Sequence, residues 1–329
     1  MQLQEDATAP GRPRVDAARP GATGSSGSAM TTSTRTRTGR LAAAMAGLAL
    51  VAACTSSGHA GTATSSAVTS STIQPTTTAP ASSPGSTAPV GGVDLRVYFL
   101  RGDHVGVAHR RVAPTVAVAR AAMTELLAGP SPAESVAGLA STIPVGTSLR
   151  GLAVAGGVAT VDLSGAFASG GGSLSMTGRL AEVTFTLTQF PTVSGVEFRV
   201  DGAPVTVFGG EGIIVDHPAT RASFEALAPA ILVETPAPMD HLSSPVRISG
   251  SADVFEATFQ VQLTDGAGRV IASRVVTATA GTGTRGSFDV SVTYALPVAG
   301  EGHLTAFDLS AKDGSRLHEV DVPVELAAA

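Results

Sequence analysis

The stretch LRGLAVAGGVATVDLS (residues 149–164) decides the fold of the first half of this chain. Its two short β-type runs are separated by the turn Ala155-Gly156-Gly157, and this pattern predicts a β-hairpin. On each side of the hairpin, apolar residues recur at spacings of three and four, which predicts one helix from about Val116 to Leu126 and another from about Met176 to Phe190.

Strand-like runs at residues 95–100, 196–200 and 204–208 complete this half of the chain. The resulting order β-α-β-β-α-β-β predicts an α+β N-terminal domain at residues 93–208. We expect a mixed sheet in this domain, with two helices on one face of the sheet.

After a connector at residues 209–230, the chain changes to seven short alternating runs, of which ILVETP is the first and HEVDVPVEL the last. Seven such runs within residues 231–326, separated by turns rich in Gly, Pro or Asp, predict an all-β immunoglobulin-like sandwich. Because this region has no Trp and no cysteine pair, we expect large phenylalanine side chains to fill its core, namely Phe255, Phe259, Phe288 and Phe307.

Cys54 is the only cysteine, and it ends the run LAAAMAGLALVAAC (residues 41–54), which follows Arg35, Arg37 and Arg40. A basic segment, a short apolar segment and small residues before a cleavage point are typical of a secretory signal. As a helix, the apolar segment would reach about 20 Å, whereas the hydrocarbon of a bilayer is roughly 30 Å thick. The segment resembles the lipobox of bacterial lipoproteins, which implies lipid attachment to Cys54; an ordinary cleaved signal and a structural helix remain as alternatives.

Residues 1–53 are therefore interpreted as a leader with a lipoprotein signal peptide, in which Met30 is the expected start of translation. Residues 54–92 contain no Asp, Glu, Lys or Arg and consist mostly of Ala, Gly, Ser, Thr and Pro, a composition that predicts a disordered tether. Together these segments predict a protein anchored to the extracytoplasmic face of the cell membrane.

The charge balance bears on the partners of the protein. Residues 54–329 carry 15 basic and 23 acidic side chains, which is a net charge near −8. A surface with this balance repels phosphate backbones, so nucleic acid is not expected as a partner.

No catalytic residue, cofactor or metal site is predicted. Gly281, Gly283 and Gly286 spell a dinucleotide-binding motif, but a strand follows where that motif requires a helix, so a hairpin loop is expected. No histidine pair has the spacing of a helical zinc site. Asp162 and Ser164 share one strand face, and they are expected to hydrogen-bond a neighbouring turn unless a pocket brings a histidine to them.

Arg221, in the connector, is the charged residue expected to join the two domains. Pairing of Arg221 with Asp216 or Glu225 would form an interdomain clamp and would make the two domains a single binding body.

Both halves resemble known domains. Residues 94–208 resemble the GerMN domain of sporulation and spore-germination proteins, through VYFLRGD, ARAAMTELLAGP, VDLSGAF and LTQFPTVSGVEFRVDG. Residues 231–326 resemble the immunoglobulin-like domain of spore-germination proteins, through PAPMDHLSSPVRISGSADVFEATFQVQLTDGAG, GSFDVSVTY and SAKDGS.

The resemblance implies a non-catalytic envelope lipoprotein, bound to the membrane by its lipid. We expect it to contact an envelope protein or a cell-wall polymer, or to self-associate through sheet edges. An envelope hydrolase and an accessory lipoprotein to a membrane sensor kinase remain as alternatives.

Overall fold

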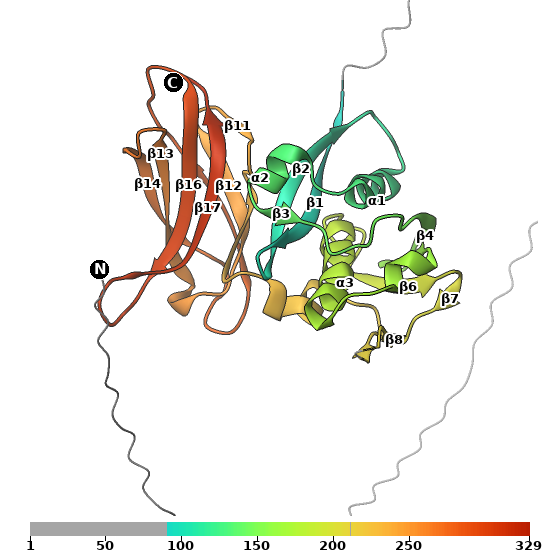
Figure 1. Ribbon diagram of the computed structural model, residues 1–329. Coiled ribbons are helices and arrows are strands. Elements are labelled where there is room, and N and C mark those ends of the chain that lie inside the picture. The colour runs from blue at the N-terminus through green and yellow to red at the C-terminus, as the bar shows by residue number, and fades with distance from the viewer. Residues whose placement is uncertain (1–90, 211) are drawn as a thin grey trace, which may run out of the picture. The chain divides into compact units, whose positions relative to one another are not determined.

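A computed structural model describes residues 91–210 and 212–329 (Figure 1). The leader at residues 1–53, Cys54 and all but the last two residues of the tether lie outside the described residues. Within the described residues, no helix has both the length and the apolar character needed to cross a bilayer.

The first domain divides its strands between two small sheets. Strands β1 (Val93–Arg101) and β2 (His104–Val112) form an antiparallel hairpin, and β3 (Leu139–Ala140) pairs with the other edge of β1. The second sheet has the order β4-β5-β6-β7, built from β4 (Leu149–Ala155), β5 (Val158–Leu163), β6 (Gly195–Val200) and β7 (Ala203–Pro204). After the second sheet, β8 (Val207–Phe208) and β9 (Ile213–Ile214) form a separate two-stranded antiparallel sheet.

The predicted hairpin is present as β4 and β5, and β5 runs parallel to β6 because the chain crosses between them through helix α3 (Ser173–Leu187). Helix α1 (Val118–Ala128) contacts both α3 and β1, and α3 contacts β1 as well. The short helix α2 (Pro132–Val136) and the 3-10 turn η1 (Gly165–Ala168) complete the domain. The α+β class is thus confirmed, with the expected mixed sheet divided into separate sheets.

Val116 was expected on the apolar face of the first helix, and this prediction was wrong. Val116 is fully exposed, because α1 begins two residues later and the Thr115 hydroxyl accepts a hydrogen bond from the backbone N–H of Ala117 just before the helix. The buried stripe of α1 consists of Ala122, Met123 and Leu126.

All seven strands predicted for the second domain are present. One sheet has the order β10-β12-β15, from β10 (Ile231–Thr235), β12 (Val246–Ala252) and β15 (Gly286–Val292). The other sheet has the order β11-β17-β16-β13-β14, from β11 (His241–Leu242), β17 (Arg316–Leu326), β16 (Gly300–Leu309), β13 (Thr258–Asp265) and β14 (Val270–Thr277). The second domain is the expected all-β sandwich.

Three of the four phenylalanines predicted for this domain are buried. Phe259 and Phe288 pack edge to face, with ring centroids 4.9 Å apart, and Phe307 is also buried. Phe255 was wrongly placed in the core: it is 62% exposed. The reason is local, because Phe255 begins the 3-10 turn η3 (Phe255–Ala257), where the alternation of inward and outward side chains is interrupted.

The connector is packed against the first domain. Its 3-10 segment η2 (Arg221–Leu227) contributes Phe224 and Leu227 to the same apolar cluster as β1 and α3. Leu232 of β10 belongs to that cluster too, while Ile231 and Val233 on the same strand belong to the core of the sandwich. Strand β10 is therefore buried on both faces, and the described residues, 91–210 and 212–329, belong to one compact unit.

Candidate functional site

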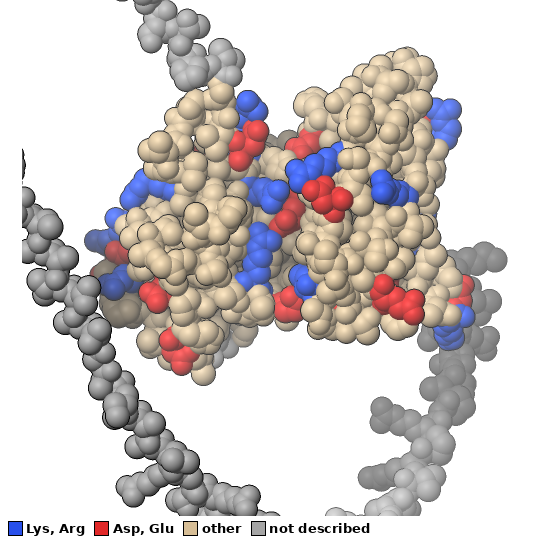
Figure 2. Space-filling model, turned by 180° about the vertical axis from the view of Figure 1, so that it is seen from behind, with Lys and Arg blue, Asp and Glu red and all other residues tan. Residues whose placement is uncertain are grey.

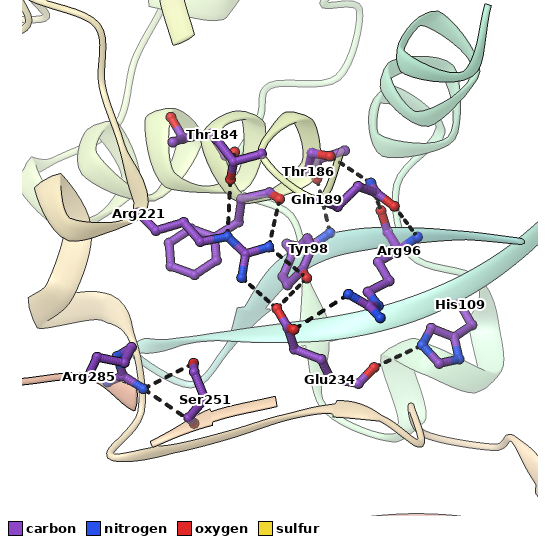
Figure 3. Close-up of polar contacts among 12 residues, drawn as sticks. Arg96, Tyr98, His109, Thr184, Thr186, Gln189, Arg221, Glu234, Ser251 and Arg285 are labelled. Carbon is purple, nitrogen blue, oxygen red and sulfur yellow. Dashed lines mark hydrogen bonds and ion pairs between the residues drawn. The ribbon is translucent and has the colours of Figure 1, made fainter. Parts of the chain in front are cut away.

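Arg221, Tyr98 and Glu234 form a closed hydrogen-bonded cluster between the first domain and β10 (Figure 3). The Tyr98 hydroxyl, on β1, donates to Oε1 of Glu234, on β10, at 2.5 Å. Nη1 of Arg221 donates to the same carboxylate oxygen at 2.6 Å, and Nη2 donates to the Tyr98 hydroxyl oxygen at 3.0 Å. Each of the three side chains thus contacts the other two.

The guanidinium of Arg221 is also held by the first domain. It lies 4.9 Å from the ring centroid of Phe185 and 5.0 Å from that of Tyr98, and its Nε donates to the Thr188 hydroxyl at 3.1 Å. A planar guanidinium suits this position, because it can stack on rings while its edge donates several hydrogen bonds. Arg221 thereby links α3 and β1 of the first domain to Glu234 of the second.

Burial and the neighbouring charged groups together determine which side chains of the cluster are protonated. Tyr98 is completely buried, and burial raises the pKa of its hydroxyl, which stays protonated and donates to Glu234. Burial alone would raise the pKa of Glu234 as well, but Arg221, the Tyr98 hydrogen bond and Arg96 together lower that pKa. Glu234 is therefore a carboxylate at neutral pH.

The structure differs from the pairing predicted for Arg221. Asp216 contacts its neighbour His217, with Oδ1 and Nδ1 2.7 Å apart, and both side chains are exposed. Glu225 pairs with Arg285, which precedes β15, at 2.7 Å. Both carboxylates lie within five residues of Arg221 in the sequence, whereas η2 presents the guanidinium of Arg221 to α3, β1 and β10 instead.

Contacts of two further side chains lie around the cluster, His109 joining the two domains and Arg285 joining the second domain to the connector. Nδ1 of His109, on β2, lies 2.7 Å from Oδ2 of Asp240, and its Nε2 lies 2.9 Å from the backbone oxygen of Glu234. Arg285 also donates to the backbone oxygen of Pro229 at 2.9 Å. These contacts extend the junction on both sides of Glu234.

Two adjoining hollows lie beside the cluster. One has a volume of about 780 Å³ and the other about 540 Å³, and they share Arg96 and Arg247. A third hollow of about 390 Å³ is lined largely by aliphatic side chains of β2, β10 and β17. In Figure 2, Arg or Lys and Asp or Glu side chains gather in the hollow at the centre of the face that is seen.

The residues weighed for catalysis have structural contacts. Oδ1 of Asp162 accepts a hydrogen bond from the backbone N–H of Gly202 at 2.9 Å, and Oγ of Ser164 accepts one from the backbone N–H of Ser148 at 3.0 Å. Neither residue lines the hollows described above. The segment with Gly281, Gly283 and Gly286 leads into β15, as predicted, and opens no helix.

Sequence reasoning missed a buried polar centre in α3. Glu182 is completely buried and accepts hydrogen bonds from the Ser141 hydroxyl and from both the N–H and the hydroxyl of Thr142. Arg179, one turn earlier, donates to the backbone oxygens of Phe167, Ser169 and Gly170. The available signal was two opposite charges, Arg179 and Glu182, three residues apart in a helix that carries no other charge.

Comparison with known families matches each half of the chain. The Germane family, described as sporulation and spore germination, matches residues 96–206. The Gmad2 family, described as the immunoglobulin-like domain of bacterial spore germination, matches residues 230–315. This chain carries both domains, in that order. The Germane (GerMN) domain contributes Tyr98 to the cluster, and the Gmad2 domain contributes Glu234.

Solved structures give more distant similarities. The tandem GerMN domains of the sporulation protein GerM from Bacillus subtilis share 14% identity, with a TM-score of 0.36, over 72% of this chain and 61% of that one. This chain thus spans less than two thirds of that tandem structure. The first GerMN domain of the same protein shares 21% identity over 40% of this chain and 98% of that one, with a TM-score of 0.35.

A protein from Clostridium perfringens described as a lipoprotein shares 21% identity, with a TM-score of 0.31, over 44% of this chain and 97% of that one. No curated protein matches this chain.

Proposed function

We propose that this protein is a non-catalytic accessory protein of the cell envelope, held at the membrane by a lipid on Cys54. In this proposal the Germane and Gmad2 domains act together to bind an envelope protein or a cell-wall polymer.

The Arg221–Tyr98–Glu234 cluster carries the proposal that the two domains bind as one body. A buried ion pair with stacked rings ties Germane residues to β10, and β10 is packed on both faces. A junction of this kind holds two surfaces in a constant relation, so that one partner can contact both. The structural contacts of Asp162 and Ser164 favour this function over a hydrolase.

The proposal is tested by crosslinking in intact cells. A photoreactive amino acid is placed at exposed surface positions of the full chain, and attached molecules are identified by mass spectrometry. We expect crosslinks to envelope components, and we expect the Cys54→Ala variant to leave the membrane fraction and to lose these crosslinks. Recovery of the protein with intact Cys54 in the cytosol would contradict the proposal, whereas crosslinks to a histidine kinase would identify the partner as a membrane sensor.

A further inference from the structure

Arg96, on β1, has fewer partners than its neighbours at the junction. Its guanidinium makes a single contact among the described residues, an ion pair in which Nη1 lies 3.5 Å from Oε2 of Glu234. Glu234 is already bonded by Arg221 and Tyr98 at 2.6 Å and 2.5 Å. One carboxylate therefore faces two arginines, which leaves one positive charge without a matching negative charge.

The surplus charge is accessible to a ligand. The side chain of Arg96 is 33% exposed, and it lines both of the adjoining hollows, of about 780 and 540 Å³. A guanidinium has five N–H donors in a planar fork, which matches the oxygens of a carboxylate or a phosphate. Arg96 therefore has donors available at the place where the two hollows meet.

We define the groove as the two hollows that share Arg96 and Arg247. Two of its other arginines pair with exposed carboxylates, whereas Arg110 is held by the buried Glu134. Arg247 pairs with Asp289 at 2.6 Å, and Arg111 pairs with Asp94 at 2.9 Å, with more than half of each side chain exposed. Exposed pairs of this kind contribute little to stability, because solvent screens them. A ligand anion can therefore replace the carboxylate partner of either arginine at little cost.

The remaining lining of the groove is suited to a hydroxyl-rich chain. It includes the hydroxyl side chains of Thr235, Ser249, Thr277, Thr279 and Ser287 and the ring of Phe190. The carboxylate of Asp240, which also lines the groove, pairs with His109. The larger hollow, of about 780 Å³, lies in the upper part of the roughly 300–1,000 Å³ range of ordinary small-molecule pockets. The second hollow adjoins it at Arg96 and Arg247. Their size favours a segment of a polymer over a single small ion.

We propose that this groove binds an anionic, hydroxyl-rich polymer of the cell wall, with Arg96 contacting its phosphate or carboxylate groups. This inference rests on the proposed function, since it names the class of partner at the domain junction. The acidic excess of residues 54–329 opposes every polyanion. It opposes duplex DNA most, because duplex DNA carries a charge about every 1.7 Å of its axis.

The test measures polymer binding by the purified full chain in detergent, using titration calorimetry. The probes are poly(glycerol phosphate), a polyuronic acid and neutral dextran, so that the phosphate and carboxylate sources are distinguished. We expect one or both polyanions to bind and dextran not to bind, with affinity that falls as salt is raised. Arg96→Gln is expected to weaken binding about tenfold, and Arg247→Gln a few-fold, because charge-assisted hydrogen bonds are lost.

Matched controls remove an exposed, paired arginine outside the groove in each domain. Arg150 pairs with Asp201 in the Germane domain, and Arg269 pairs with Asp265 in the Gmad2 domain. Arg150→Gln and Arg269→Gln are expected to bind the polyanion as the unaltered chain does. If Arg96→Gln unfolds more easily than the unaltered chain, Arg247→Gln provides the test, since its side chain is largely exposed.

Equal binding by the unaltered chain, Arg96→Gln and Arg247→Gln overturns the inference, as does equal binding of dextran or the absence of any polymer binding. If no polymer binds while the protein is still crosslinked to an envelope protein, the inference fails and the proposed function stands. If polyanions bind in vitro but the protein is found in the cytosol, the proposed function fails and the groove still binds polyanions.

Discussion

At the scale of single residues, Glu182 is an ionisable side chain that is completely buried in α3. Burial raises the pKa of its carboxyl to about 7, although hydrogen bonds from Thr142 and Ser141 and the charge of Arg179 oppose this shift. The same carboxyl holds the segment from Ser141 to Ile143 against α3, because it accepts from three donors there. One residue thus serves a structural purpose and remains titratable near neutrality.

The raised pKa of Glu182 predicts that the protein loses stability as pH rises. The native carboxyl binds a proton up to about pH 7, whereas an unfolded glutamate releases its proton near pH 4.3. The Glu182 carboxyl therefore makes its full contribution to the free energy of unfolding below about pH 4.3. As the pH rises to about 7, this contribution, on the order of 3 kcal/mol, is lost.

Glu182→Gln should flatten the pH dependence of stability in this window, because Gln can accept from Thr142 and donate to Ser141 without titrating. Urea unfolding at pH 4.5, 6 and 7.5 measures the effect. Glu197, an exposed glutamate on β6, gives a control in Glu197→Gln, which should keep the dependence of the unaltered chain. Parallel pH profiles for the unaltered chain and Glu182→Gln would reject this assignment.

At the scale of elements, β10 determines how the two domains meet. Its alternate residues Ile231 and Val233 fill the sandwich core, while Leu232 and Glu234 face the Germane domain. The register with β12 shifts between Val233 and Thr235, and Gly250 of β12 lies beside this irregularity. A Cβ built on Gly250 would lie 2.0 Å from the backbone oxygen of Leu232, so the close approach of the two strands requires glycine.

Gly250→Ala is therefore expected to displace β10 and to lower the free energy of unfolding by about 2 kcal/mol or more, as overpacking against backbone does. Gly300, at the start of β16, has open space around its position, so Gly300→Ala should change stability by less than about 0.5 kcal/mol. Denaturant unfolding of both variants measures the difference, and a loss of similar size in both would show that the contact with Leu232 is unimportant.

For the whole molecule, Arg221 is one of the side chains that join the two domains, together with Arg96 and His109. Its removal leaves Glu234 buried with Arg96 as its remaining cation, at 3.5 Å. Breaking a buried pair by deleting one partner typically costs about 3–5 kcal/mol, more than deleting both charges. We expect Arg221→Ala to be near the lower end of this range, because the Arg221 side chain is 29% exposed.

Arg221→Ala should also make the connector and β10 accessible to protease and should broaden the distance distribution from small-angle scattering. The double variant Arg221→Leu with Glu234→Gln should recover part of the lost stability, since the two buried charges are removed together and only the partly exposed Arg96 loses its partner. Arg199→Ala is the control, because Arg199 is an exposed arginine that bonds only the backbone oxygen of Gly202. Proteolysis and scattering that stay unchanged in Arg221→Ala would rule out a clamp.

Much of the fold could be predicted from the sequence because its signals are local. Seven of the eight strands of the sandwich, the hairpin of β4 and β5 and the loop before β15 each follow from the spacing of apolar residues and turn residues in one segment. The same local reading failed at Phe255 and Val116, where a turn or a late helix start interrupts the repeat. The predictions for Cys54 and residues 1–53 also rest on local composition, and they remain predictions.

The sequence by itself determined the two domain classes, their order and the importance of Arg221. Only the tertiary structure decided that Arg221 pairs with Tyr98 and Glu234 in place of Asp216 or Glu225, and that Arg96 has charge to spare. The physical reason is that periodicity reports which face of an element is buried, whereas ion-pair partners depend on which elements are packed together. Tyr98 and Arg221 are 123 residues apart in the chain, so no local pattern could bring them to the same carboxylate.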